Sequence, residues 1–474
     1  MNTRVLLILA GGAAVIWSIR RWRSAVQVGM VLLIIEGAIR KWVFPGSQDL
    51  VYFAKDVFFL GAYLGYFRDL PRLRYRLPSL PAFYGVLILA AAYGLLQIFN
   101  PALPNLLVGV FGFKAYFFYV PLLFVVPAAF PTDAAICQFL RRYAWISIPV
   151  GLLAVAQFLS PASSILNTYA RTNEEAYVAT FGSSVFVRVT ATFSFISGYT
   201  SFLLAITILI LGLLGAARWR LRGHLLTFAA LGMTFLGILM TGSRGPVLLL
   251  GLLLPLYWWL AIIRERGGGT TFGRVVIALV LVAAFVVFAG DDALDAFRGR
   301  AAGVSDVRSR IINPFLSPVR LLPDAGLLGF GIGAAHQTAA AVTPSLVPYS
   351  WLRGFIVEAE SGRIMVELGA LGFLLIYFLR FYLAIFAFRQ VFLLRTRFHR
   401  AIATATLLLS LVAIPGGVVF DVIADVYYWF FAGLLMLAIR LDGEAVKAAA
   451  RARAAMPAGV LGPAVPVPVN RETA

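Results

Sequence analysis

The residues best suited to chemistry gather in one polar segment, residues 291–362, of an otherwise apolar chain. It contains no lysine but six arginines: Arg298, Arg300, Arg308, Arg310, Arg320 and Arg353. It also contains His336 and, near its end, the carboxylates of Glu358 and Glu360. A histidine or a carboxylate can act as a general base toward a hydroxyl group. We therefore predict Glu358, Glu360 and His336 as catalytic candidates, against the alternative that His336 is a structural or solvated loop residue.

The next apolar run begins with a further carboxylate. Glu360, Arg363 and Glu367 are separated by three and four residues, so a helix would place them on one face. An ionisable side chain that enters lipid faces the interior of a helix bundle or a water-filled cavity. Glu367 is accordingly a fourth catalytic candidate. The alternative is a structural pair between Arg363 and Glu367.

A tight turn, Thr241-Gly-Ser-Arg244-Gly-Pro246, separates two apolar runs. Proline suits the first turn of a helix, and the free N–H groups of a helix N-terminus favour an anion. A guanidinium group holds a phosphate through two parallel hydrogen bonds, which lysine cannot do. We predict that Arg244 binds a diphosphate. The alternative is an arginine that extends from the membrane surface toward water.

Three more arginines are candidates for the same ligand. Arg188 precedes an apolar run that begins at residue 192, and we expect it on the same membrane face as Arg244. Arg353 and Arg363, at the end of the polar segment, could guide an anionic substrate. For Arg188 the alternative role is that of an interfacial anchor.

Other features carry weaker signals. The run Gly329-Phe-Gly-Ile-Gly333 lacks the strand–turn–helix context of a dinucleotide site, and we interpret it as a flexible turn that brings His336 toward the membrane.

Charges also occur within or beside the apolar runs: Glu36 with Arg40, Lys55 with Asp56, Lys114, Asp421 and Asp425. We expect Glu36 to pair with Arg40, and hydration at the outer face to account for Lys55, Asp56, Asp421 and Asp425. These charges would also suit a proton relay in a transporter.

The elements that position these residues are membrane-spanning helices. Hydrophobic residues make up 61% of the 474 residues, against about 45–50% in soluble proteins. Apolar runs long enough to cross a bilayer recur along the whole chain. The formal net charge of +19 comes largely from arginines in short loops, which is the positive-inside pattern and not a nucleic-acid footprint. A single cysteine, Cys137, excludes an intramolecular disulfide framework.

The predicted fold class is all-α, a polytopic transmembrane helical bundle of about 12–13 spans with one large periplasmic loop. We expect transmembrane helices within 1–290, the polar loop at 291–362, further helices within 363–440 and a disordered cytoplasmic tail at 441–474. The first span is a retained helix, because it lacks a long basic leader and a cleavage site. The expected spans are residues 4–19, 25–44, 51–67, 79–99, 107–130, 143–160, 192–215, 224–241, 246–263, 275–290, 364–388, 401–419 and 425–440.

Four features together resemble the O-antigen ligase and O-antigen polymerase superfamily. They are the Thr241-Gly-Ser-Arg-Gly-Pro turn, the large polar segment, the Gly-x-Gly-x-Gly element and Val366-Glu-Leu-Gly-Ala-Leu-Gly372. The resemblance implies a glycosyltransferase of the bacterial inner membrane with a periplasmic site. Its donor would be an undecaprenyl-diphosphate-linked glycan, and it would need no nucleotide sugar, cofactor or metal.

The resemblance assigns Arg244 to the arginine of the Ser-Arg-Gly turn and Arg188 to an arginine before an earlier span. Many ligases carry a His-Asn pair before the Glu-Leu-Gly element, whereas this chain has Glu358-Ala359 there. That difference favours a polymerase of surface or exopolysaccharide over a ligase to lipid A core. Polysaccharide-assembly proteins are possible partners, together with the lipid bilayer and the lipid-linked glycan. The rival from another class is a transporter or flippase of lipid-linked sugars that uses Glu36, Lys114 and Asp421.

Overall fold

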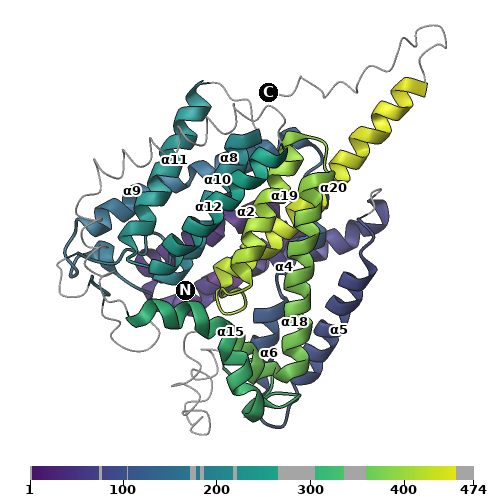
Figure 1. Cartoon of the computed structure of the whole chain (residues 1–474). Coiled ribbons are helices and arrows are strands. Elements are labelled where there is room, and N and C mark those ends of the chain that lie inside the picture. Colours follow the sequence, from purple (N-terminus) through teal and green to yellow (C-terminus); the bar gives the residue numbers. More distant parts are fainter. Residues whose placement is uncertain are drawn as a thin grey trace.

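In the part of the chain that it describes, the computed structural model contains helices and the segments that connect them. An isolated antiparallel β-bridge pairs Thr180 with Val187. The structure describes residues 3–73, 77–103, 105–170, 178–181, 186–216, 221–264, 305–335 and 359–454. The helices pack side by side into one bundle, and the C-terminal part of the last helix extends beyond it (Figure 1).

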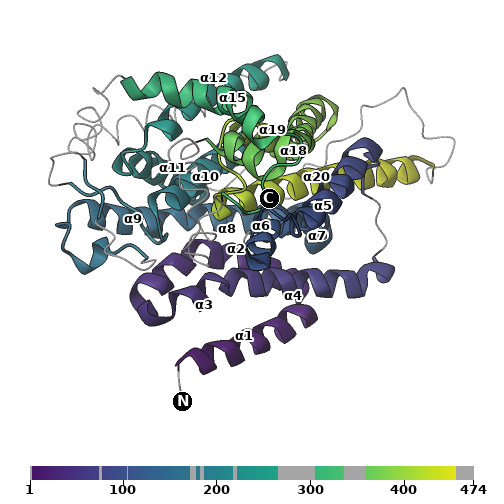
Figure 2. The same cartoon turned by 90° about the horizontal axis from the view of Figure 1, so that it is seen from below.

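The N-terminal part of the bundle is a layer of helices. It consists of α1 (Thr3–Arg20), α2 (Trp22–Ala38), the π-helix η1 (Ile39–Val43), the 3₁₀ turn η2 (Pro45–Ser47), α3 (Gln48–Tyr52), α4 (Ala54–Asp69) and the 3₁₀ turn η3 (Leu70–Arg72). In Figure 2, α1 lies at the periphery beside α4. Glycines permit close packing here, because a Cβ at Gly61 would lie 2.3 Å from the Cβ of Ser18.

The middle of the chain forms a second group of helices. It consists of α5 (Pro81–Gln97), α6 (Leu106–Phe117), α7 (Leu122–Ala129), α8 (Asp133–Trp145), α9 (Ser147–Phe158), the 3₁₀ turn η4 (Ile165–Asn167), α10 (Ile196–Ala216), α11 (Leu221–Met240), α12 (Arg244–Arg264) and α15 (Ser305–Ala325). The pair α6 and α7 is bent by 44°. Pro121 immediately precedes α7, where proline fits the first turn but cannot donate a backbone hydrogen bond.

The C-terminal part contains α18 (Glu360–Leu393), α19 (Arg397–Ala413) and α20 (Val422–Ala454). The first turns of α18 fold back on the rest of the helix at Gly369, whose φ of 63° and ψ of −170° are not helical. Figure 1 shows α15 beside the lower end of α18. The last helix continues to Ala454, well beyond Arg440, where we expected the final span to end.

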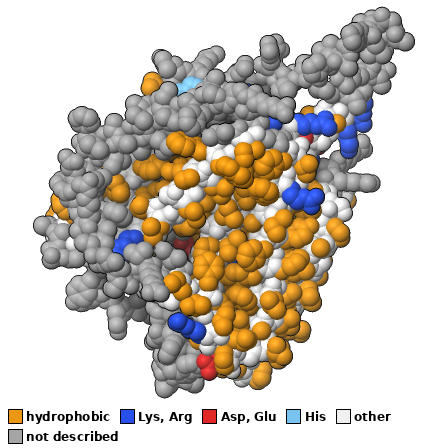
Figure 3. All heavy atoms as spheres, in the orientation of Figure 1, with side chains coloured by type: hydrophobic (Ala, Val, Ile, Leu, Met, Phe, Trp, Pro, Cys, Tyr) orange, Lys and Arg blue, Asp and Glu red, His pale blue; other side chains and the backbone are white. Residues whose placement is uncertain are grey.

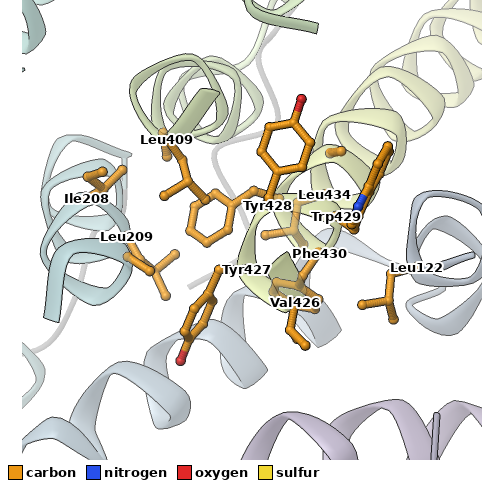
Figure 4. Close-up of a cluster of buried hydrophobic side chains, with 14 of the residues drawn as sticks. Leu122, Ile208, Leu209, Leu409, Val426, Tyr427, Tyr428, Trp429, Phe430 and Leu434 are labelled. Atoms are coloured by element: carbon orange, nitrogen blue, oxygen red, sulfur yellow. The ribbon is translucent and has the colours of Figure 1, made fainter. Parts of the chain in front are cut away.

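The core is centred on α20. Its residues Tyr427 and Phe430 are 1% exposed and pack with side chains of α7, α10 and α19 (Figure 4). The periphery is also apolar: Leu374 and Ile385 of α18 are 66% and 60% exposed, and hydrophobic side chains predominate on the described part of the face in Figure 3. A bundle that is apolar both inside and outside is typical of a membrane protein.

Eight helices of the described part are long and apolar enough to span a membrane, or nine if the bent pair α6–α7 counts as one span. Pro81–Gln97 and Arg244–Leu260 are shorter apolar helices at positions where we expected spans. The expected span at 275–290 lies outside the described residues. The chain is therefore a polytopic helical membrane protein.

Candidate functional site

The segment that contains Arg188 docks against the turn before α12. Arg188 donates from Nε to the carbonyl oxygen of Thr241 at 2.8 Å and from Nη2 to the hydroxyl oxygen of Ser243 at 3.2 Å. The backbone N–H of Val189 donates to the carbonyl oxygen of Met240 at 3.2 Å. Since Arg244 is the first residue of α12, these contacts bring the segments of the two predicted phosphate-binding arginines together.

The continuation of that segment, residues 190–194, is held by the first half of the chain. Gln157 of α9 accepts from the backbone N–H groups of Thr190 at 3.3 Å and Ala191 at 2.7 Å. Arg40 of η1 donates from Nη1 to the hydroxyl oxygen of Ser194 at 2.9 Å. The segment passes so close to α2 that a Cβ at Gly37 would lie 2.5 Å from the backbone nitrogen of Ser194, so only glycine fits there.

Lys41, the next residue of η1, makes three hydrogen bonds to the same segment. Its Nζ lies 3.2 Å from Oγ1 of Thr190, 2.6 Å from the carbonyl oxygen of Ala191 and 2.9 Å from that of Phe193. The side chain is 4% exposed, and it forms no ion pair with a carboxylate of the described residues. Our reading of the sequence missed Lys41. A signal was present, because the whole chain has only four lysines and one of them ends an apolar run.

A buried ionic cluster adjoins η1. Lys55 donates to Glu36 at 2.6 Å, Lys114 lies 2.6 Å from Asp56, and Arg40 lies 3.8 Å from Glu36, which confirms the pair predicted between Glu36 and Arg40. The cations surround one ring, Tyr52, at 5.2 Å (Arg40), 4.3 Å (Lys55) and 5.0 Å (Lys114) from its centroid. Such contacts contribute about 0.5–2 kcal/mol each.

The expectation of ordinary hydration for some of these charges was wrong. Lys55, Asp56 and Asp425 are 1%, 6% and 1% exposed. Helices α4 and α20, to which these residues belong, pack inside the bundle. A charged side chain that is buried in this way needs a partner of opposite charge or a hydrogen bond. Asp56 has Lys114 and the hydroxyl of Tyr119, which donates at 2.5 Å. Asp421 caps α20: its Oδ1 accepts from the backbone N–H of Ile423 at 3.0 Å.

Glu360, a predicted catalytic residue, forms a buried salt bridge with Arg380. The fold-back at Gly369 makes this contact possible, because an unbroken helix would hold the two residues about 30 Å apart along its axis. Oε2 of Glu360 accepts from the backbone N–H of Phe420 at 3.1 Å, and Nη1 of Arg380 donates to the carbonyl oxygen of Ala413 at 2.9 Å. Sequence reasoning missed Arg380, although a single arginine in the middle of an apolar run is itself a signal.

Glu367, another predicted catalytic residue, is fully buried and accepts hydrogen bonds from a tyrosine hydroxyl and from backbone N–H groups. Oε2 accepts from the hydroxyl of Tyr116 at 2.9 Å, and Oε1 accepts from the backbone N–H of Ala335 at 2.8 Å. The guanidinium of Arg363 lies 5.2 Å from the ring centroid of Phe420. Arg363 also interacts electrostatically with the carboxylate of Glu367, so the structural pairing of these two residues stays a prediction.

The glycine-rich element packs tightly against the fold-back. Gly329, Gly331 and Gly333 all have positive φ. The backbone N–H of Phe330 donates to the carbonyl oxygen of Val366 at 2.8 Å, and that of Gly331 donates to the carbonyl oxygen of Glu367 at 2.9 Å. These bonds satisfy carbonyl groups that the helix break leaves without helical partners. The element follows α15, a helix, so it lacks the strand of a dinucleotide site.

The structure therefore separates the predicted residues into three sets. Arg188 and Arg244 belong to adjoining segments, and Glu360, Arg363 and Glu367 belong to the fold-back of α18. His336, Arg353 and Glu358 lie outside the described residues, as do Arg298 and Arg300. Ala335, the residue before His336, is the last described residue before that gap.

No group of three or more histidine, cysteine, aspartate or glutamate side chains that could hold a metal ion occurs among the residues described. Among the described contacts, Arg188 and Lys41 donate to carbonyl and hydroxyl oxygens, and pairs of opposite charge adjoin them. This chemistry suits recognition of an anion at the membrane surface. No protein-family model matches the chain, and no curated protein matches it significantly.

Proposed function

We propose that the chain is a glycosyltransferase of the bacterial inner membrane. It moves a glycan from undecaprenyl diphosphate to an acceptor hydroxyl on the periplasmic side, as a polymerase of a surface or exopolysaccharide. The observation that carries the proposal is the contact of Arg188 with Thr241 and Ser243, which joins the segments of two arginines predicted to bind diphosphate. The multi-pass helical fold provides the lipid environment that such a donor needs.

In this proposal the anomeric C–O bond breaks and the diphosphate leaves with the bonding electron pair. Arg188 and Arg244 stabilise the growing negative charge, an effect for which the removal of one donor typically costs about 10²–10³ in turnover. The acceptor hydroxyl attacks from the opposite face, and a base takes its proton. The ligase alternative differs only in the acceptor, which would be a sugar of the lipid A core.

The carboxylates of the fold-back are poorly suited to act as that base. Both oxygens of Glu360 are occupied by Arg380 and the N–H of Phe420, and both oxygens of Glu367 are occupied by Tyr116 and Ala335. A general base must reach the proton that it abstracts. We therefore favour His336 or Glu358 as the base.

The test replaces Arg244 with Ala and with Lys and follows donor consumption and polymer length in membrane vesicles. Arg451→Ala, an exposed arginine near the end of α20, is the matched control. We expect Arg244→Ala to lower turnover about 100-fold or more, and Arg244→Lys to recover only part, because an ammonium cannot form the two-pronged contact. Wild-type turnover in both variants, at equal expression, would remove Arg244 from the site.

A second candidate function is transport of lipid-linked sugars. The buried cluster around Tyr52, with Glu36, Lys55, Asp56 and Lys114, is the observation that favours it, because proton relays use such groups. Purified protein in detergent separates the two. A transferase forms a glycosidic bond there, whereas a transporter has no compartments to connect and forms none.

A further inference from the structure

Lys41 is a buried lysine whose described hydrogen bonds all go to neutral oxygens. Its three acceptors belong to Thr190, Ala191 and Phe193, within five residues of Arg188 along the chain. Its ammonium also lies 4.5 Å from the ring centroid of Trp42. The same segment is bound to the 241–243 turn through Arg188. Lys41 therefore connects the N-terminal layer to the proposed diphosphate site.

Stability alone does not account for a lysine at this position. Removing an ammonium group from water costs several kcal/mol even after relaxation, and a carboxylate partner normally offsets part of that cost. Lys55, on the neighbouring helix, has such a partner in Glu36, whereas Lys41 relies on carbonyl and hydroxyl oxygens. An apolar side chain of the same length would avoid this cost but would leave three buried acceptors without their described donor. What distinguishes Lys41 from an apolar residue is therefore its hold on the 190–193 segment.

Two features of the backbone indicate that the geometry of this segment matters. Ala191 has a φ of 47°, in the left-handed region that costs a non-glycine residue about 1–2 kcal/mol. Such strain persists where surrounding contacts fix the backbone, and here Gln157 and Lys41 supply them. Lys41 itself lies in the π-helix η1, a rare local structure that is frequent at functional sites.

We propose that Lys41 is a positioning residue, which fixes the 190–193 segment so that Arg188 faces the turn before Arg244. The inference rests on the proposed function, since it gives Arg188 its ligand, the diphosphate of the lipid-linked donor. Lys41 acts through Arg188 and need not touch the substrate.

The experiment measures inhibition of the purified full-length protein by inorganic pyrophosphate, together with KM and kcat for the lipid-linked donor. Lys41→Met is compared with Lys447→Met, the same substitution at the exposed lysine near the end of α20. We expect Lys41→Met to raise the pyrophosphate inhibition constant and the donor KM about tenfold, because misplacement of a binding group weakens recognition. Lys447→Met should match the wild type.

A double-mutant cycle separates positioning from a general structural role. In an Arg188→Ala background, Lys41→Met should weaken pyrophosphate inhibition no further, because its effect passes through Arg188. Equal weakening with and without Arg188, or an unchanged inhibition constant in Lys41→Met, would overturn the inference. Thr190→Val, which removes one acceptor of Lys41 and keeps the shape, gives the same test if Lys41→Met does not fold. It should raise the constant by a smaller factor, again only when Arg188 is present.

The proposed function can fail separately. If Arg188→Ala and Arg244→Ala leave pyrophosphate inhibition and donor turnover unchanged, the diphosphate site itself is refuted. If those variants are impaired and Lys41→Met behaves like Lys447→Met, only the positioning role is refuted.

Discussion

Two regions of this molecule bury charge, and they satisfy it in different ways. In the fold-back of α18, Glu360 meets Arg380 and Glu367 meets Tyr116 and a backbone N–H. In the segment around Arg188, the cations Lys41 and Arg188 donate to carbonyl and hydroxyl oxygens. In the first region, Arg380 neutralises Glu360, and neutral donors satisfy Glu367. In the second region, the hydrogen bonds described for Lys41 go to carbonyl and hydroxyl oxygens and not to a carboxylate.

The difference separates groups that hold the fold from groups that recognise a ligand. The two charges of a buried ion pair largely cancel, so the pair attracts a charged substrate only weakly. Removal of one partner leaves the other charge buried and unpaired. Cations on neutral oxygens keep their field and can attract an anion. Under the proposed function, the pair of Glu360 and Arg380 holds the fold, and Arg188 and Lys41 serve recognition. Variants in the first region should affect stability, and variants in the second should affect recognition.

Arg380→Met should produce the largest effect on stability. It leaves the carboxylate of Glu360 buried beside an apolar side chain, at an expected cost of about 3–5 kcal/mol. Thermal or denaturant unfolding in detergent measures the change. The double variant Arg380→Met with Glu360→Gln removes both charges and should recover most of the loss. If the single variant unfolds like the wild type, the pair does not stabilise the fold-back, and the contrast between the two regions is refuted.

Gly369→Ala should come next. A Cβ at Gly369 would lie 2.4 Å from the carbonyl carbon and oxygen of Leu327, and the φ of 63° is unfavourable for alanine. Strain of this kind costs about 1–3 kcal/mol before the clash is added. Gly85→Ala is the control, because a Cβ there meets nothing within 4 Å and alanine favours a helix by about 1 kcal/mol. Similar unfolding curves for the two variants would contradict the fold-back geometry.

A third charge cluster extends the comparison to the other end of α20. His399, outside the candidate spans, has Nε2 at 2.8 Å from Asp133 and Nδ1 at 3.2 Å from Asp442. Burial lowers the pKa of His399, but the hydrogen bonds and charges of the two aspartates outweigh it and raise the pKa above its usual value. The cluster therefore belongs with the paired charges, and it titrates.

Because the folded-state pKa of His399 is raised, its contribution to stability is complete below the unfolded pKa of about 6.5 and is lost as pH rises through the folded pKa. Unfolding in detergent across this range should show lower stability at higher pH. Asp442→Asn should reduce that pH dependence and cost about 1.5 kcal/mol at low pH, as expected for a charge-assisted hydrogen bond. A pH dependence equal to that of the wild type in Asp442→Asn would show that this pair does not titrate with folding.

The sequence predicted the helical membrane fold because hydropathy is a local property. It also predicted the pair of Glu36 and Arg40, since a helix places residues four apart side by side. The sequence placed Arg188 and Arg244 on one membrane face only because the positive-inside pattern assigns each loop to a side of the membrane. Their actual connection, through Thr241 and Ser243, depends on how distant segments pack.

What the sequence could not predict depends on tertiary structure. The 3.6-residue period placed Glu360 and Glu367 on one helix face, but the break at Gly369 turns the first part of α18 back toward Arg380. Glycine within a Glu-Leu-Gly-Ala run does not itself signal a reversal. The rarity of lysine in this chain could have pointed to Lys41, but its partners could not be predicted, because two of the three are backbone oxygens that leave no pattern in the sequence.

The smallest predicted effect concerns the strained residue of the second region. Ala191→Gly relieves a left-handed φ worth about 1–2 kcal/mol. Against this, glycine adds about 0.4–1 kcal/mol of unfolded-state entropy and removes one buried methyl group, worth about 0.8 kcal/mol. The terms nearly cancel, so we expect stability to change by less than about 0.5 kcal/mol.

The matched control is Ala438→Gly, at an equally buried position in the middle of α20. There no strain is relieved, so the same substitution should cost about 1 kcal/mol for the loss of helix propensity alone. If both variants lost equal stability, Ala191 would not be strained. If only Ala438→Gly lost stability while Ala191→Gly weakened pyrophosphate inhibition, the segment would be shown to trade backbone strain for the position of Arg188. In that case the left-handed backbone at Ala191 would serve recognition of the anion and not the stability of the fold.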